Sequence, residues 1–395
     1  MLYLDLFSGC GGLAYGFHQA GWKAVFAVEK NEDAFLTLEH NLIRNSDHFL
    51  WPDWLPVKNL DINEILEKHS QRLKKLRGKV DLIAGGPPCQ GFSIAGRRDS
   101  SDIRNKLVFS YIEMVRLISP KMIVFENVKG FLHSINDNSE ATYASIIQSE
   151  LSKLGYLIHP ELLNFSEFGI PQKRTRFILF GIRNDFSKSI GIEPEDFFQR
   201  LQTNKKSFLK SKKLGNSVSL KEAISDLLEK HGTIESPDSP GFRQGCYGSP
   251  ESHYQRLMRK RTRKNAMVNS HRFAKHSQEV IGRFKIAIEK KLKPYEYKAF
   301  FNLKKSSTKL LNENVPTPTL TTLPDDYIHF QEPRILTVRE YARIQSFPDS
   351  FEFKGKYTTG SNRRKLEVPR YSQIGNAIPP LFAELAGKVL LEFLK

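Results

Sequence analysis

Short apolar runs alternate with helix-like stretches through the first half of the chain. The apolar runs are rich in Leu, Ile, Val and Phe, as buried strands are, and they cover residues 2–7, 24–28, 80–84, 122–125 and 177–181. Apolar positions recur with helical spacing at residues 31–41, 106–118, 140–155 and 381–394. Strands that alternate with helices predict an α/β fold, in which helices cover both faces of a sheet.

The pattern changes at about Asp185. From there to about residue 330 the chain is polar and basic, with turn clusters such as 236–241 and little regular periodicity. Helical spacing returns at residues 339–348, as an amphipathic helix that Pro348 ends. The change predicts a separate domain or a large insert in this part of the chain.

Length and composition narrow the class of protein. The chain has 395 residues, of which 39% are hydrophobic, enough for one large or two medium domains with a core. No apolar run reaches the ~18 residues of a membrane span, and the amino terminus lacks a signal-peptide pattern, so we expect a cytoplasmic protein without a membrane contact. The three cysteines, Cys10, Cys89 and Cys246, lie far apart, so we expect neither a metal site nor a disulfide.

The charge of the chain points to a polyanionic partner. The formal net charge is +17, and the stretches 205–213 and 256–264 carry many cations and no acid. A run of like charge is often only a solvated surface. Two such blocks in one segment favour a nucleic-acid surface.

Candidate chemistry lies at the ends of the predicted strands. Residues 85–93 read Gly-Gly-Pro-Pro-Cys-Gln-Gly-Phe-Ser, so Cys89 follows a strand at the edge where open α/β sheets bind ligands. Most cysteines are small buried residues, but two prolines and a following Gln90 favour an exposed nucleophile. Glu126 follows another strand and lies beside Cys89 if the two strands are neighbours. The alternative for Glu126 is a structural ion pair with Arg or Lys.

Two further groups of residues are candidates for binding. The stretch Asp5-Leu6-Phe7-Ser8-Gly9-Cys10-Gly11-Gly12 forms a glycine-rich turn between a strand and a helix, and Glu29 ends the second strand, where an acid suits ribose hydroxyls. A tight turn and a surface acid are the alternatives. Arg174 and Arg176 lie two apart on an extended segment, which predicts that both project to the same side, toward a carbonyl, phosphate or carboxylate.

These motifs together closely resemble those of the cytosine-5 DNA methyltransferases. Pro-Pro-Cys-Gln at 87–90, Glu-Asn-Val at 126–128 and Gln-x-Arg-x-Arg at 172–176 occur in the family's order, with the late motifs at 339–348 and 373–380. The resemblance implies a Rossmann-like S-adenosylmethionine-dependent sheet in residues 1–185, completed by 370–395. It places an irregular target-recognition domain in residues 186–369, usually closed by a threonine-rich element such as 317–322.

The resemblance also assigns roles to residues. Cys89 would add to C6 of a flipped cytosine, Glu126 would protonate N3, Arg176 would hold O2, and Arg174 would steady the pocket. S-adenosylmethionine would be held by Phe7, Gly9, Gly11, Glu29, Asp61, Ile62, Pro88, Leu107 and Asn376. Within this set, Glu29 would bind the ribose and Asp61 the adenine amino group, between Phe7 and Ile62. The polar segment 94–102 would form a lid over nucleic acid, and a plain surface loop is the alternative.

The implied partner is double-stranded DNA, bound by a monomer at the bacterial nucleoid, with a companion restriction endonuclease acting on the same DNA. Two other functions stay open on these residues. A tRNA cytosine-5 methyltransferase shares most motifs, although the long basic insert favours DNA. A DNA-binding repressor on the same scaffold is the other, although the intact Cys89, Glu126 and Arg176 argue against binding as the only role.

Overall fold

The computed structural model describes residues 1–88, 106–132, 142–263, 266–359 and 367–395. The chain forms two compact units. Unit 1 consists of Met1–Phe165, Thr175–Phe208 and Phe382–Lys395, and unit 2 of Ser166–Arg174 and Leu209–Leu381. In this division residues 186–208 group with unit 1, and residues 166–174 and 370–381 with unit 2. The expected functional division, into 1–185 with 370–395 and 186–369, stays a prediction.

Unit 1 is built on a six-stranded sheet with the order β2-β1-β3-β4-β7-β5. Its strands are β1 (Leu2–Leu6), β2 (Lys23–Val28), β3 (Leu82–Gly85), β4 (Met122–Val128), β5 (Tyr156–Asn164) and β7 (Thr175–Arg183). The first four are parallel, and β7 runs antiparallel to β4 and β5. The strand order reverses between β1 and β3, which is where open α/β sheets place their ligand crevice.

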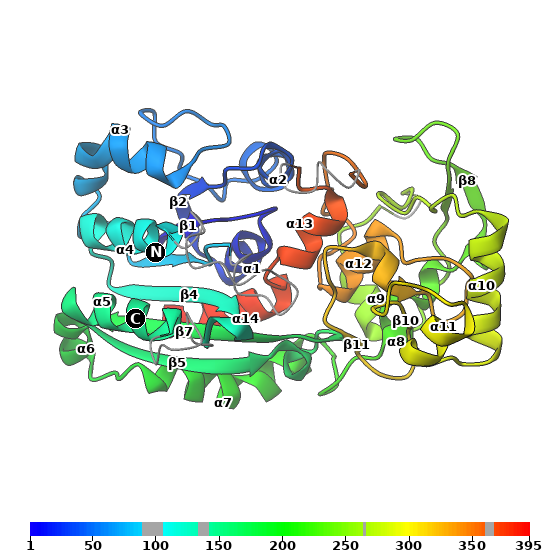
Figure 1. The fold of residues 1–395 in the computed structure, drawn as a ribbon. Coiled ribbons are helices and arrows are strands. Elements are labelled where there is room, and N and C mark those ends of the chain that lie inside the picture. Colours follow the sequence, from blue (N-terminus) through cyan, green and yellow to red (C-terminus); the bar gives the residue numbers. More distant parts are fainter. Residues whose placement is uncertain (89–105, 133–141, 264–265, 360–366) are drawn as a thin grey trace. The chain divides into compact units, whose positions relative to one another are not determined.

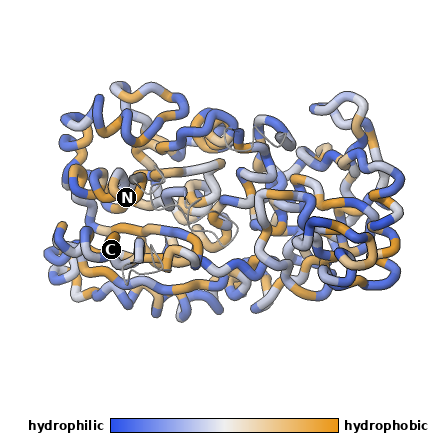
Figure 2. Tube along the Cα trace, viewed as in Figure 1, coloured by the Kyte–Doolittle hydropathy of each residue, from blue (hydrophilic) through white to orange (hydrophobic). Residues whose placement is uncertain are grey.

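Helices cover both faces of this sheet (Figure 1). They are α1 (Gly12–Ala20), α2 (Glu32–Leu38), the π-helix η1 (Glu39–Arg44), α3 (Ile62–Lys74), α4 (Lys106–Ile118), α5 (Tyr143–Lys153), α6 (Asn184–Ile190), α7 (Glu195–Ser211) and α14 (Pro380–Glu392), with the short turns η3 (Lys129–Leu132) and η4 (Phe165–Phe168). The predicted α/β fold and the helix 106–118 are confirmed. The long helix α7 was not predicted, because its apolar positions are interrupted by lysines. Figure 2 shows this alternation along α7, in contrast to the mostly hydrophobic β4.

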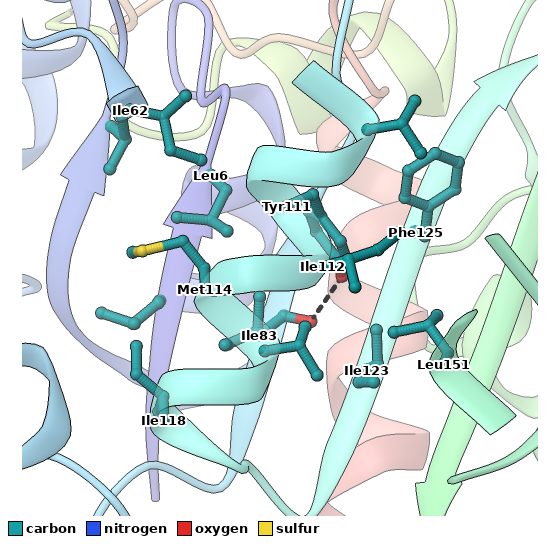
Figure 3. Close-up of a cluster of buried hydrophobic side chains, with 14 of the residues drawn as sticks. Leu6, Ile62, Ile83, Tyr111, Ile112, Met114, Ile118, Ile123, Phe125 and Leu151 are labelled. Atoms are coloured by element: carbon teal, nitrogen blue, oxygen red, sulfur yellow. Dashed lines mark hydrogen bonds between the residues drawn. The ribbon is translucent and has the colours of Figure 1, made fainter. Parts of the chain in front are cut away.

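The main core lies between the sheet and helices α3, α4 and α5. Leu6, Ile83 and Ile123 face α4, from which Met114 and Ile118 pack against them (Figure 3). Tyr111 of α4 is fully buried, and its hydroxyl donates to Ile83 O at 3.3 Å and to Val124 O at 3.2 Å. These bonds satisfy the polar atom that the burial of tyrosine brings into the core, and they connect the helix to β3 and β4.

The opposite face of the sheet is covered by α1 and α14. Tyr3 alternates with the core residues of β1 and packs edge-on against Phe17 of α1 at 5.0 Å between ring centres. Trp22 donates its indole N–H to Gly387 O of α14 at 2.9 Å. By length and composition, Arg370–Glu392 is the one described stretch able to cross a membrane, but 72% of its apolar window is buried inside the protein, as in a core helix.

Unit 2 contains short elements joined by irregular chain. Its helices are α8 (Leu220–Ile224), α9 (His253–Met258), α10 (Gln278–Glu289), α11 (Pro294–Phe300), α12 (Val338–Ile344) and α13 (Arg370–Asn376), with the turns η5 (Ser225–Leu227), η6 (Glu229–His231) and η7 (Pro324–Asp326). Its strands are β6 (Gln172–Lys173), β8 (Thr233–Glu235), β9 (Arg243–Gly245), β10 (Lys309–Leu310), β11 (Thr317–Pro318) and β12 (Tyr327–Ile328). This agrees with the weak periodicity of the segment.

Helix α12 differs from its prediction as an amphipathic helix. All seven of its residues are buried, the charged ones included. Arg343 contacts Asp349 at 2.5 Å and Asp226 at 3.1 Å, and Glu340 contacts Arg334 at 2.7 Å. The polar side of the helix therefore faces buried partners of opposite charge rather than water, a situation that spacing in the sequence does not distinguish from exposure.

Candidate active site

The chain just before Cys89 is held against the end of β4. Cys89 and the segment 94–102 lie outside the described residues. β3 and β4 are neighbours, with Gly85 opposite Phe125. A side chain on Gly86 would come within 2.5 Å of the backbone oxygen of Glu126, so only glycine fits there. The Asn127 side chain donates to Pro87 O at 3.2 Å. Asn127 had no separate predicted role, although it directly follows Glu126 in the sequence.

Glu126 forms an ion pair with Arg176. Val128 of β4 lies opposite Arg176 of β7, which places the two side chains at the same end of the sheet. Arg176 Nε lies 3.0 Å from Glu126 Oε1, and the side chains are 11% and 13% exposed. The pair brings a carboxyl group and a guanidinium to the strand ends from which Pro87 and Pro88 continue toward Cys89. The ion pair is the structural alternative for Glu126, and β3 and β4 are neighbours as the prediction required. The position of Glu126 beside Cys89 itself stays a prediction.

Arg174 has different surroundings from Arg176. Arg174 is 2% exposed and belongs to unit 2, where its Nη1 donates to Leu320 O at 3.5 Å. Arg176 belongs to unit 1 and contacts Glu126. The structure therefore brings Arg176 together with Glu126, whereas Arg174 contacts Leu320 of the threonine-rich element. A joint role of the two arginines stays a prediction.

The glycine-rich turn after β1 has an open space beside it. Phe7, Gly9 and Gly11 have φ angles of 59°, 55° and 92°, a region that glycine adopts without strain. A Cβ on Gly11 would lie 3.0 Å from Leu38, whereas a Cβ on Gly9 would meet no described atom within 4 Å. Gly11 therefore allows close packing on α2, and Gly9 leaves room for a ligand beside the backbone.

Glu29 is fixed by this turn. Its Oε2 accepts from Gly9 N at 2.8 Å, and its Oε1 accepts from Asn31 N at 2.7 Å. Burial raises the pKa of Glu29, while these two N–H groups oppose the rise. Each oxygen keeps a further lone pair, so the carboxylate can still accept hydrogen bonds from a pair of hydroxyls.

Asp61 lies at the same edge as Glu29. Leu60 N donates to Glu29 O at 2.7 Å, and Asp61 caps α3 by accepting from Asn63 N at 2.8 Å. Burial raises the pKa of Asp61, but the hydrogen bond and ion pair with Lys30, at 2.9 Å, and the hydrogen bonds from Asn63 together outweigh burial, so the pKa is lowered. Asp61 is thus a charged acceptor near Glu29, as a binding site for hydroxyl and amino groups requires.

The remaining expected cofactor residues have varied exposure. Phe7 and Leu107 are half-buried and pack against the main core, and Ile62 is 2% exposed within it. Pro88 is exposed. Asn376 is exposed at the last position of α13, in unit 2. It does not cap the final helix, the structural alternative for this residue, because α13 continues to Asn376 and α14 begins later, at Pro380.

Asp5 is a buried acid that sequence reasoning did not select. It is 1% exposed, and within the described part of the chain neither carboxylate oxygen has a hydrogen-bond partner. Burial raises the pKa of Asp5 well above its usual value. Its signal in the sequence was a single acid inside an apolar strand. The residues that fit an adenosyl group are Glu29, whose carboxylate keeps free acceptor capacity, and Gly9, which has open space beside it.

Comparisons with known proteins identify the family of the chain. The profile of the family described as "C-5 cytosine-specific DNA methylase" matches residues 1–392. The Type II methyltransferase M.DdeI of Desulfomicrobium norvegicum is 33% identical, over 97% of this chain and 87% of its own. M.PspPI of a Psychrobacter species is 32% identical, over 99% of this chain and 79% of its own.

Solved structures show the same fold. One, described as a DNA modification methyltransferase of an Escherichia coli prophage, has a TM-score of 0.69 and 24% identity, over 100% of this chain and 99% of that one. The S. pombe Dnmt2 methyltransferase has a TM-score of 0.57 and 16% identity over the same shares. By the profile match and the identity to M.DdeI, the chain belongs to the C-5 cytosine-specific DNA methylase family and is a DNA (cytosine-5-)-methyltransferase that uses S-adenosylmethionine.

Proposed function

We propose that this enzyme methylates C5 of a cytosine flipped out of double-stranded DNA, through a covalent bond between Cys89 Sγ and C6 of the base. The observation that supports it most is the Glu126–Arg176 pair at 3.0 Å, at the strand ends where the chain leads into Cys89. The pair offers a proton donor and a cation to one planar ring, which are the groups that the N3 and O2 atoms of cytosine need.

The covalent route answers a chemical difficulty, since C5 of cytosine is a poor nucleophile. The Cys89 thiolate adds to C6 while the Glu126 carboxyl protonates N3, and the electron pair of the C5–C6 double bond moves toward C5. Bound S-adenosylmethionine would supply an activated methyl group to C5, with the methyl–sulfonium bond broken and the thioether of S-adenosylhomocysteine as leaving group. A base then removes the C5 proton, and the electron pair of that C–H bond restores the C5–C6 double bond and expels the Cys89 thiolate, while N3 returns its proton to the Glu126 carboxylate. Arg176 stabilises the charge near O2, and Arg174 steadies this segment.

The cofactor is held, in this proposal, by the residues at the switch between β1 and β3. Glu29 accepts from the ribose hydroxyls and Asp61 from the adenine amino group. Phe7, Ile62, Leu107 and Pro88 provide apolar contacts, Gly9 and Gly11 let the backbone approach, and Asn376 contributes from the late motif. The supporting observations are the fixed carboxylate of Glu29 and the open space beside Gly9.

Residues 1–185 with 370–395 form the catalytic and cofactor-binding part, and residues 186–369 form the target-recognition part. A duplex buries C6 in the base stack, so the cytosine must leave the helix at a cost of a few kcal/mol. The net charge of +17 supplies favourable contacts with phosphates that offset this cost. Such contacts give affinity, whereas the base edges are read by side chains of the recognition part.

The relatives named Type II methyltransferases support a place in a restriction-modification system. A companion endonuclease would cut the same DNA sequence when it is unmethylated. We propose in addition that the enzyme acts as a monomer, on the nucleoid in the bacterial cytoplasm.

The methylated product shows whether DNA or tRNA is the substrate. Purified enzyme, S-adenosylmethionine and either duplex DNA or tRNA are incubated, and the nucleosides are analysed for 5-methylcytosine. The proposal expects 5-methyldeoxycytidine in DNA at one recurring sequence, found by bisulfite sequencing. Methylation of tRNA alone, or binding of DNA without turnover, would contradict it.

A further inference from the structure

Two buried glutamines of unit 2 bond to each other through their side chains. Gln172 begins β6, and Gln345 follows directly after α12. Both are 0% exposed, and Gln172 Nε2 donates to Gln345 Oε1 at 2.7 Å. They are 173 residues apart in the chain, so their contact depends on the tertiary fold.

Each of the two side-chain amides forms hydrogen bonds through both its oxygen and its nitrogen. Gln172 Oε1 accepts from Leu320 N at 2.9 Å. Gln345 Nε2 donates to Ile374 O at 2.9 Å and to Ala377 O at 3.1 Å. Turning either amide over would place donors against donors or oxygens against carbonyls, so the pair has one satisfied arrangement. A buried pair with all its partners in place holds its neighbours in a defined geometry.

The segments that the pair connects carry the family motifs. Gln172 lies opposite Thr317 in the pairing of β6 with β11, and Thr319 Oγ1 donates to Lys173 O at 2.7 Å. On the other side, Gln345 holds carbonyls that flank Asn376. The strand segment leading to Arg174, the threonine-rich element and the end of α13 therefore meet at one amide pair.

Gly375 shows how close this junction is. A Cβ on Gly375 would lie 2.7 Å from Thr321 O, so the last turn of α13 rests directly on the threonine-rich element. Because the neighbouring backbones are in contact, a displacement of one segment also displaces the others.

We propose that Gln172 and Gln345 are positioning residues for methyl transfer, which fix the turn carrying Asn376 relative to the strand segment that leads to Arg174. The inference rests on the proposed roles of Asn376 and Arg174. Without the glutamine pair, neither the turn with Asn376 nor the segment with Arg174 keeps its defined position. The affinity for S-adenosylmethionine and the rate of methyl transfer therefore fall together.

The test uses two substitutions at one position. Gln345→Met keeps the approximate volume but removes the side-chain partner of Ala377 O and Gln172 Nε2, whereas Ile374 O keeps only its bond from Ala377 N. We expect the Kd for S-adenosylmethionine, measured by calorimetry on the full chain without DNA, to rise tenfold or more. Gln345→Glu keeps the acceptor for Gln172 but lacks the N–H donors. Protonation of the introduced carboxyl group returns one O–H donor. The Kd of this variant for S-adenosylmethionine should therefore approach the wild-type value as the pH is lowered.

Gln255→Met is the matched control. Gln255 of α9 is another fully buried glutamine of unit 2, and its Nε2 donates to Lys221 O at 3.3 Å and to Ser225 Oγ at 2.8 Å. We expect Gln255→Met to lower the melting temperature about as much as Gln345→Met while keeping the wild-type Kd. Equal Kd values for wild type, Gln345→Met and Gln255→Met would overturn the inference. Because cofactor binding is measured without DNA, failure of the wild type to methylate cytosine would instead count against the proposed function.

Discussion

At the scale of single residues, charged groups in the candidate active site are held by specific contacts. Glu126 has Arg176 at 3.0 Å, and Glu29 has two backbone N–H groups. Groups this buried lose hydration, so their hydrogen bonds decide both their orientation and their protonation. Replacing one such group by its neutral amide tests its chemistry with little change in shape.

Glu126→Gln removes the proton donor but keeps an oxygen for Arg176. We expect kcat to fall by about 10²- to 10⁴-fold, the usual range for loss of general acid catalysis, with the Kd for S-adenosylmethionine unchanged. Steady-state methylation of duplex DNA measures this. Glu113→Gln is the control, since Glu113 pairs with Arg116 on the exposed surface of α4 and should leave kcat at the wild-type value. Wild-type kcat in Glu126→Gln would exclude the proposed role.

Glu29→Gln turns one acceptor into an N–H donor that faces Gly9 N or Asn31 N. The mismatch and the lost charge should weaken the hydrogen bonds to ribose hydroxyls, so we expect the Kd for S-adenosylmethionine to rise at least about tenfold. Calorimetric titration without DNA measures it. The exposed pair Glu150 and Lys153 on α5 offers a control, Glu150→Gln, which should bind as wild type does. Unchanged affinity in Glu29→Gln would remove Glu29 from the cofactor site.

At the scale of elements, the buried titratable groups in and around helix α12 should make the stability of unit 2 depend on pH. Burial lowers the pKa of His271 to about 4 and that of His329 to about 3. Burial raises the pKa of Glu340, but the Arg334 guanidinium outweighs burial and holds it at about 2. All three pKa values lie below those of the unfolded chain, so the unfolded state binds protons first as the pH falls.

The free energy of unfolding should therefore decrease as the pH falls from about 6.5, first through the two histidines and below about 4.5 also through Glu340. Each group contributes up to about 1.4 kcal/mol per pH unit between its unfolded and folded pKa values. Urea unfolding at a series of pH values measures the slope, and His329→Gln should reduce it. The exposed His253→Gln should not. A flat profile between pH 6.5 and 4 would contradict the buried state of these histidines.

The elements differ in how far the sequence predicts them. Apolar runs identified β1 to β4, and helical spacing identified α4, because these elements are buried on one or both sides. Strand β5 was missed because it is an edge strand of half-buried residues that includes Pro160. Helix α12 was predicted, but its burial was not, since the partners of its charges come from distant positions such as Asp226 and Asp349.

The candidate site was predicted to a similar extent. Strand ends and motif order identified Glu126, Arg176 and Glu29, whose surroundings the structure then provided. Asn127 and Asp5 were not selected, because their importance comes from a contact with Pro87 and from a missing partner within the described residues. Neither property follows from residue type or spacing.

At the scale of the whole molecule, the positive charge should control DNA binding. With a net charge of +17, binding releases counterions from the phosphates, and the association constant falls by about 0.9 log unit per log unit of salt for each phosphate contact. We expect a loss of about 10³-fold or more between 50 and 200 mM salt if six or more phosphates are neutralised. Fluorescence anisotropy with a labelled duplex measures this. The Kd for S-adenosylmethionine serves as the control and should change little, whereas a salt-independent DNA affinity would contradict the electrostatic account.

The central claim is that Cys89 bonds to C6 of the target cytosine, and a duplex with 5-fluorocytosine at the methylated position tests it most directly. Fluorine cannot leave C5 as a proton does, so the reaction should stop with the enzyme attached to DNA. With S-adenosylmethionine present, the wild type should give a complex that survives denaturation, with the DNA on the peptide containing Cys89. Cys89→Ser should bind cofactor and DNA but give no such complex. Normal methylation by Cys89→Ser, or an adduct at its wild-type yield, would contradict the account.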